Sequence, residues 1–82
     1  MPKLFIIDDH KLFASGLAGL LEDDLPEADI EVFSEVETAL DAAREASPDV
    51  ALLDYYLPGL SGAEAIQKLR EAAPDTKVIV IS

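Results

Sequence analysis

Two adjacent carboxylates, Asp8 and Asp9, follow the apolar run LFII near the start of the chain. Neighbouring carboxylates repel each other, and neither is stable beside a core without a compensating partner. A third acid, Asp54, ends the apolar segment VALLD, and a hydroxyl, Ser82, ends VIVIS. Hard oxygen ligands of this kind suit Mg²⁺, which binds a few carboxylates and carbonyls and keeps several waters. Because a bound Mg²⁺ would offset the repulsion, these residues favour a cation site.

The elements that must position these residues are short strands alternating with helices. Apolar residues recur at helical spacing in three segments, and Ser61 and Glu64 match a capping box at the start of the third. The run VIVI is typical of a parallel strand covered on both faces. The order β-α-β-α-β-α-β predicts an α/β fold with a parallel sheet and right-handed crossovers. The predicted strands contain Leu4–Ile7, Ile30–Phe33, Val50–Leu53 and Val78–Ile81.

In an open α/β sheet, ligands bind beyond the carboxyl ends of the strands. We therefore expect the three acids and Ser82 to lie at one edge of the sheet. Acids at strand ends are also common as solvated starts of loops, but three at one edge favour a site. After Asp54, Pro58 and Gly59 predict a turn that holds the backbone so that a carbonyl faces the metal. An ordinary strand-to-helix turn fits PGLSG equally well.

Composition limits the class of protein. The chain has 82 residues, which predicts one small domain, and 17 acids against 6 bases give a net charge of −11. This charge argues against direct nucleic-acid binding and is compatible with a cation or a basic partner. The chain has no cysteine, no signal-peptide pattern and no apolar run long enough to span a membrane. We expect a cytoplasmic protein.

The motifs together resemble a known family. Strand–DDH–helix, then LLDYYLPGLSG, then VIVIS is similar to the receiver domain of two-component response regulators. DDHKLFASGL resembles the NarL/FixJ branch, whose members usually carry a C-terminal helix-turn-helix. The resemblance implies a flavodoxin-like (CheY-like) three-layer fold with strand order 2-1-3-4. It also implies Mg²⁺-dependent acceptance of a phosphoryl group from a sensor histidine kinase, normally controlling a DNA-binding transcription-regulator output domain. It does not imply an enzyme acting on an external substrate.

The resemblance assigns a role to each site residue. Asp54 matches the phosphoacceptor. Asp9 matches the direct metal ligand of the acidic pair, and Asp8 the member that acts mainly through water. The backbone carbonyl of Tyr56 would complete the metal site, and Ser82 matches the switch hydroxyl that hydrogen-bonds the phosphoryl group.

The sequence also departs from the family pattern. A complete receiver continues with a helix, a fifth strand ending in a lysine, and a last helix, so residues 1–82 correspond to its N-terminal portion. Lys3 and Lys77 start their predicted strands at the opposite edge from the acids, and Lys11 is the nearest base. A pseudo-receiver, an interaction module without phosphorylation, therefore stays open as an alternative. A phosphatase of the haloacid dehalogenase type is disfavoured, because its D-x-D motif is absent.

Two further expectations concern His10 and the last strand. A surface or capping role for His10 is favoured over catalysis, since a lone histidine has no evident nucleophile to serve. Without a fifth strand, Val78–Ile81 would be an exposed edge with unpaired backbone groups. We therefore expect self-association through that edge, opposed by the net charge and strengthened by salt.

Overall fold

The computed structural model describes residues 1–81, and Ser82, the predicted switch hydroxyl, lies outside them. Strands and helices alternate as predicted, and each strand contains its predicted apolar run with at most one further residue. The elements are β1 (Lys3–Ile7), α1 (Lys11–Asp24), β2 (Asp29–Phe33), α2 (Val36–Ala46), β3 (Val50–Asp54), α3 (Gly62–Ala72) and β4 (Lys77–Ile81).

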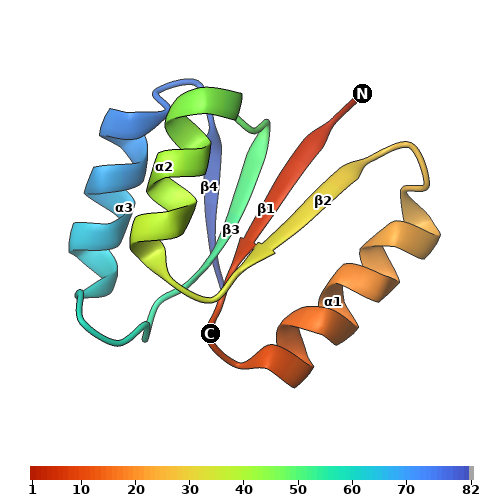
Figure 1. Cartoon of the computed structure of the whole chain (residues 1–82), viewed down its shortest axis with the longest axis horizontal. Helices are drawn as coiled ribbons and strands as arrows, with labels where there is room; N and C mark the ends of the chain where they lie inside the picture. The colour runs from red at the N-terminus through yellow and green to blue at the C-terminus, as the bar shows by residue number, and fades with distance from the viewer. Residues whose placement is uncertain (82) are drawn as a thin grey trace.

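The four strands form one parallel sheet in the order β2-β1-β3-β4, which confirms the predicted order. Because all strands are parallel, their carboxyl ends lie at the same edge of the sheet (Figure 1). The register places Ile7 opposite both Phe33 and Leu53, and Asp54 opposite Ile81. The residues that follow β1 and β3 are therefore neighbours in space.

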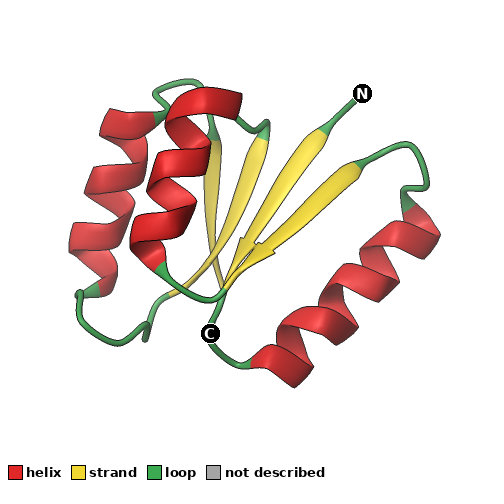
Figure 2. Ribbon diagram, viewed as in Figure 1, coloured by secondary structure: helices red, strands yellow, loops and turns green. Residues whose placement is uncertain are grey.

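The sheet lies between two helical layers, with α1 on one face and α2 and α3 together on the other (Figure 2). The core fills the space between the sheet and α2 and α3. Phe5 and Ile7 belong to this core, and the alternation along a strand turns Leu4 and Ile6, also buried, towards the side of α1. Burial on both faces explains why β1 is an unbroken apolar run. The core comprises Phe5, Ile7, Val36, Ala39, Leu40, Ala43, Ala51, Leu53, Leu57, Ala65, Leu69 and Ala73.

Local chemistry fixes the ends of the helices near the site. The predicted capping box is present: the Glu64 backbone N–H donates to Ser61 Oγ at 3.1 Å, and the Ser61 N–H donates to Glu64 Oε1 at 3.3 Å. Gly59 has φ of 88°, a conformation that favours glycine. A Cβ atom at Gly62 would collide with the ring of Tyr55. The loop from Asp54 to α3 is therefore held by its glycines and its cap.

The expectation that VIVI is covered on both faces does not hold for residues 1–81. Ile79 and Val80 are 41% and 43% exposed, and β4 pairs with β3 alone in this part of the chain. On the face of α1, this helix packs against β1 and β2 and leaves Ile79 uncovered. Val80 lies on the opposite face with Val78, which the α2 and α3 layer covers only in part at this strand. Among the described helices, none is long and apolar enough to cross a membrane.

Candidate functional site

The backbone after β1 carries the first two acids to the edge of the sheet. The Asp8 N–H donates to the Phe33 carbonyl at 2.9 Å, which extends the pairing of β1 with β2 by one residue. Asp8 is consequently buried, with 3% of its surface exposed, whereas the side chain of Asp9 is 35% exposed. The two neighbours thus differ in environment, one held by the sheet and one at its rim.

Asp54 is the last residue of β3 and is 4% exposed. The Tyr56 backbone N–H donates to Asp54 Oδ1 at 3.1 Å, which fixes the orientation of the carboxylate. Asp54 Oδ2 is buried and has no hydrogen-bond partner, and the same is true of Asp9 Oδ1. A buried polar atom without a partner is costly, and such atoms are concentrated at functional sites.

The structure brings the three predicted carboxylates together. Asp8, Asp9, His10 and Asp54 each offer one ligand atom, and these atoms all lie within 4.8 Å of one another. Carboxylates crowded in this way repel one another, and a cation among them would relieve the repulsion. The donor set therefore fits a divalent metal such as Mg²⁺. The Tyr56 N–H contacts the cluster at Asp54. That the Tyr56 carbonyl completes the metal site stays a prediction.

A surface or capping role was predicted for His10, and its side chain is indeed largely exposed. His10 occupies the N-cap position of α1, but its side chain makes no capping hydrogen bond. Its Nδ1 instead lies 2.8 Å from Asp8 Oδ1, 3.4 Å from Asp9 Oδ1 and 3.3 Å from Asp54 Oδ2. The hydrogen bond to Asp8, together with the charges of the three acids, raises the pKa of His10 above its usual value. Only the adjacency of His10 to the acid pair could have suggested this contact.

No lysine or arginine within residues 1–81 lies at ion-pair distance from the three carboxylates. Lys3 and Lys77 begin β1 and β4 at the opposite edge of the sheet, as predicted. Lys11 begins α1 and is exposed. In the described part of the chain, the positive group facing the acids is therefore the imidazole of His10 when it is protonated.

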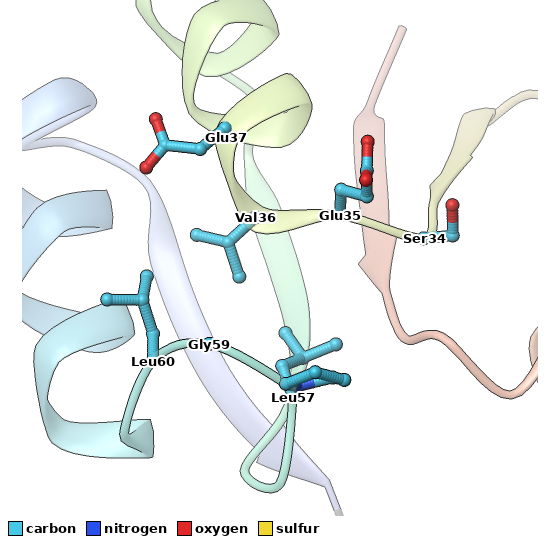
Figure 3. Close-up of a pocket in the computed structure, with 8 residues that line it drawn as sticks. Ser34, Glu35, Val36, Glu37, Leu57, Gly59 and Leu60 are labelled. Atoms are coloured by element: carbon cyan, nitrogen blue, oxygen red, sulfur yellow. The ribbon is translucent and has the colours of Figure 1, made fainter.

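A pocket of about 460 Å³ lies between the start of α2 and the loop that follows β3 (Figure 3). Val36, Leu57 and Leu60 supply its apolar side chains, and Glu35 and Glu37 add acidic groups. None of the three clustered carboxylates lines it. The unpartnered polar atoms lie at the cluster, so the cluster and not this pocket is the candidate site.

A parallel sheet in the order 2-1-3-4, with acids at the carboxyl ends of its two central strands, is the arrangement of the flavodoxin-like receiver fold. The family model for the response regulator receiver domain matches residues 4–82. The chain belongs to this family. Receiver domains of response regulators work in two-component systems, interact with histidine kinases and bind Mg²⁺ at an acidic pocket.

Curated relatives are named as response regulators or transcriptional regulatory proteins. The response regulator GacA of Pseudomonas aeruginosa is 40% identical over 88 aligned positions, covering 100% of this chain and 38% of that protein. The transcriptional regulatory protein LiaR of Bacillus subtilis is 36% identical over 85 positions, covering 100% of this chain and 39% of that protein. The chain thus spans less than two-fifths of the length of these relatives.

Solved structures with the same fold include two receivers. The signal receiver domain of a modulated diguanylate cyclase from Desulfovibrio desulfuricans has a TM-score of 0.86 and 31% identity, covering 99% of this chain and 64% of that one. A response regulator protein from Burkholderia pseudomallei has a TM-score of 0.85 and 26% identity, covering 98% of this chain and 46% of that one. The Burkholderia structure contains a phosphorylated aspartic acid and a calcium ion.

Proposed function

We propose that Asp54 accepts a phosphoryl group from a sensor histidine kinase in a Mg²⁺-dependent reaction. The observation that carries this proposal is Asp54 Oδ2, a buried carboxylate oxygen without a hydrogen-bond partner at the carboxyl end of β3. A carboxylate oxygen of Asp54 lies within 4.8 Å of ligand atoms from Asp8 and Asp9. This is the arrangement expected of a nucleophile beside a cation site.

The residues divide the chemistry between them. The Tyr56 N–H holds Asp54 Oδ1, so that Oδ2 is the oxygen left to attack phosphorus. The new O–P bond forms as the N–P bond of the donor's phosphohistidine breaks, and the histidine keeps the electron pair. Bound Mg²⁺ would neutralise negative charge on the phosphoryl oxygens. The Ser82 hydroxyl is proposed to hydrogen-bond the phosphoryl group once it is transferred.

The metal would be held by Asp9 and Asp54 directly, by Asp8 through water, and by the backbone carbonyl of Tyr56. Asp9 Oδ1, a buried oxygen without a hydrogen-bond partner, belongs to this set, whereas the other such oxygen, Asp54 Oδ2, is the proposed nucleophile. The phosphorylated aspartic acid and the calcium ion in the Burkholderia relative support an acidic phosphoacceptor site in this fold.

The setting we propose is cytoplasmic two-component signalling. The names of the curated relatives, a response regulator and a transcriptional regulatory protein, support a phosphorylation signal that controls a DNA-binding output domain. The net charge of −11 supports a receiver segment that does not itself contact nucleic acid. We propose no action on an external substrate.

Phosphorylation by acetyl phosphate with Mg²⁺ tests the assignment, read by intact-mass spectrometry and by mapping of the modified residue. We expect one phosphoryl group on Asp54, and none after Asp54→Asn. Asp49→Asn is the matched control, because Asp49 is an acid at the opposite edge of the sheet and should leave labelling intact. A folded wild-type protein that stays unlabelled would refute the proposal in favour of the pseudo-receiver.

We also propose that the 82-residue polypeptide self-associates through the β4 edge. Within residues 1–81 this strand has a partner on one side only, and Ile79 and Val80 are exposed. Because the chain carries a charge of −11, association should strengthen with salt. Sedimentation at several salt concentrations should show this in wild type and much less in Ile79→Lys. A monomer at every salt concentration would exclude the proposal.

A further inference from the structure

The imidazole of His10 faces the same three carboxylates that the proposed function assigns to the metal. Its ring is 68% exposed, yet Nδ1 lies within 3.4 Å of an oxygen of each acid. The contact with Asp8 Oδ1, at 2.8 Å, is a hydrogen bond. Since one N–H can point well at only one acceptor, Asp9 Oδ1 and Asp54 Oδ2 remain without hydrogen bonds. His10 therefore leaves the cluster incompletely satisfied.

The separations between Nδ1 and the three oxygens match those of neighbouring ligands on one metal ion. With metal–ligand bonds of about 2.0–2.2 Å, adjacent ligands lie about 3 Å apart. The three separations here are 2.8, 3.4 and 3.3 Å. Asp54 is 4% exposed, and its unpartnered Oδ2 faces this position, which is independent evidence for a missing partner.

We propose that His10 Nδ1 is a ligand that allows the cluster to bind a borderline transition-metal ion of the Zn²⁺ class. An oxygen-only set of carboxylates suits Mg²⁺, whereas imidazole suits Zn²⁺, Ni²⁺ and Cu²⁺. The metal takes the place of the proton on Nδ1 and bonds to Asp8, Asp9 and Asp54. This inference rests on the carboxylate cluster of the proposed function, and it adds a second class of metal that competes with Mg²⁺ there.

A simpler role for His10 makes a different prediction. If the imidazole were only a positive charge that offsets the acids, its removal would raise the affinity for Zn²⁺ and for Mg²⁺ alike. If Nδ1 is a ligand, its removal lowers the affinity for Zn²⁺ and leaves that for Mg²⁺ unchanged or higher. The ratio of the two affinities separates these roles.

The test is calorimetric titration of untagged protein with ZnCl₂ and with MgCl₂, in wild type, His10→Ala and Asp9→Ala. We expect His10→Ala to lower the ratio of Zn²⁺ to Mg²⁺ affinity at least about tenfold. Asp9→Ala, which removes an oxygen ligand, should weaken both metals. Because His10 is the only histidine, NMR of its ring nitrogens gives a second readout. Zn²⁺ should shift the Nδ1 resonance of the wild type through direct bonding, and by more than Mg²⁺, which would act on the ring only through the acids that contact it.

An unchanged affinity ratio in His10→Ala, or an Nδ1 resonance that Zn²⁺ does not shift, would overturn the inference. These outcomes are separate from failure of the proposed function. Labelling of Asp54 with Mg²⁺ and an unchanged Zn²⁺ to Mg²⁺ ratio would exclude the Nδ1 ligand and keep the phosphoacceptor. Zn²⁺ binding through Nδ1 in a chain that acetyl phosphate never labels would keep the Nδ1 ligand and exclude the phosphoacceptor.

Discussion

Both edges of the sheet carry acids that meet backbone donors and a basic side chain, but among the described residues only the carboxyl edge leaves buried carboxylate oxygens without a hydrogen bond. At the amino edge, Lys3 Nζ lies 2.9 Å from Asp29 Oδ2 and 3.4 Å from Glu31 Oε1. The Lys3 backbone N–H donates to Asp49 Oδ2 at 2.8 Å. At the carboxyl edge, the acids of the cluster face one another and a single imidazole, and two of their buried oxygens have no hydrogen-bond partner.

This contrast shows that the cluster is not a general consequence of an acidic composition. The same chain, with 17 acids, provides partners for acids at the edge where no chemistry is predicted. It leaves carboxylates unsatisfied at the edge where α/β sheets bind ligands. Local rules of polar satisfaction are broken most often at functional sites, where the unsatisfied group serves binding or reaction.

The largest effect is expected at the amino edge, from loss of a buried hydrogen bond. Thr76 is 7% exposed, and its Oγ1 donates to the Pro48 carbonyl at 2.5 Å. Thr76→Val keeps the shape but leaves that carbonyl without its partner, so we expect the free energy of unfolding to fall by about 1–3 kcal/mol. Urea unfolding measures this. Thr38→Val is the matched control on an exposed position of α2, and an equal loss in both variants would contradict the argument.

The next effect distinguishes the edges by their response to metal. Mg²⁺ at ten times its Kd should raise the free energy of unfolding by about 1.4 kcal/mol, because it binds only the folded chain. For a domain of this size, that corresponds to a rise in Tm of about 5–10 °C. Thermal melts with and without Mg²⁺ should show the rise in wild type and in Asp29→Ala, but not in Asp9→Ala. If Mg²⁺ left the Tm of the wild type unchanged, the proposed cation site at the carboxyl edge would be refuted.

Much of this arrangement could be predicted from the sequence because it follows from periodicity and topology. Apolar runs of four residues between helical patterns fix a parallel sheet, and a parallel sheet brings the residues after β1 and β3 to one edge. The capping box of Ser61 and Glu64 was readable because both partners lie in one turn. The convergence of Asp8, Asp9 and Asp54 needs no more information than this.

The rest depends on choices that the sequence does not encode locally. The side chain of His10 could cap α1 or point to solvent, but it hydrogen-bonds Asp8 and also approaches Asp54, which the fold brings beside the end of β1. Ile79 and Val80 face opposite sides of the sheet, so their exposure depends on how far the helices of both layers cover β4, and the pattern VIVI carries no information about that. Side-chain orientation and coverage by distant elements are therefore what the sequence left open.

Neutralising one acid should have opposite effects on stability at the two edges. In metal-free protein, Asp54→Asn removes a charge from the crowded cluster while its amide oxygen can still accept the Tyr56 N–H, so unfolding should cost about 1 kcal/mol more. Asp29→Asn removes an acid that is paired with Lys3, so the free energy of unfolding should fall slightly. Urea unfolding with a chelator present measures both. Destabilisation by both substitutions would mean that the cluster is not under electrostatic strain.

The smallest effect concerns the ion pairs of Lys3 at the amino edge. The hydrogen bond to Asp29, helped by Glu31, raises the pKa of Lys3 above its ordinary value of 10.5. Because the folded pKa is the higher one, the stabilisation is fully present below pH 10.5 and is lost as the pH rises through the folded pKa. Lys3→Met keeps an apolar stem without the charge, and it should lower Tm by roughly 1–3 °C at neutral pH and low salt. The difference from wild type should shrink in high salt, since the pair is exposed to solvent. The difference in Tm should stay constant between pH 7 and 10 and disappear at higher pH, as measured by thermal melts across this range.

A difference in Tm that persisted above the folded pKa would show that Lys3 acts through packing, and the amino edge would then no longer be an example of charge compensation.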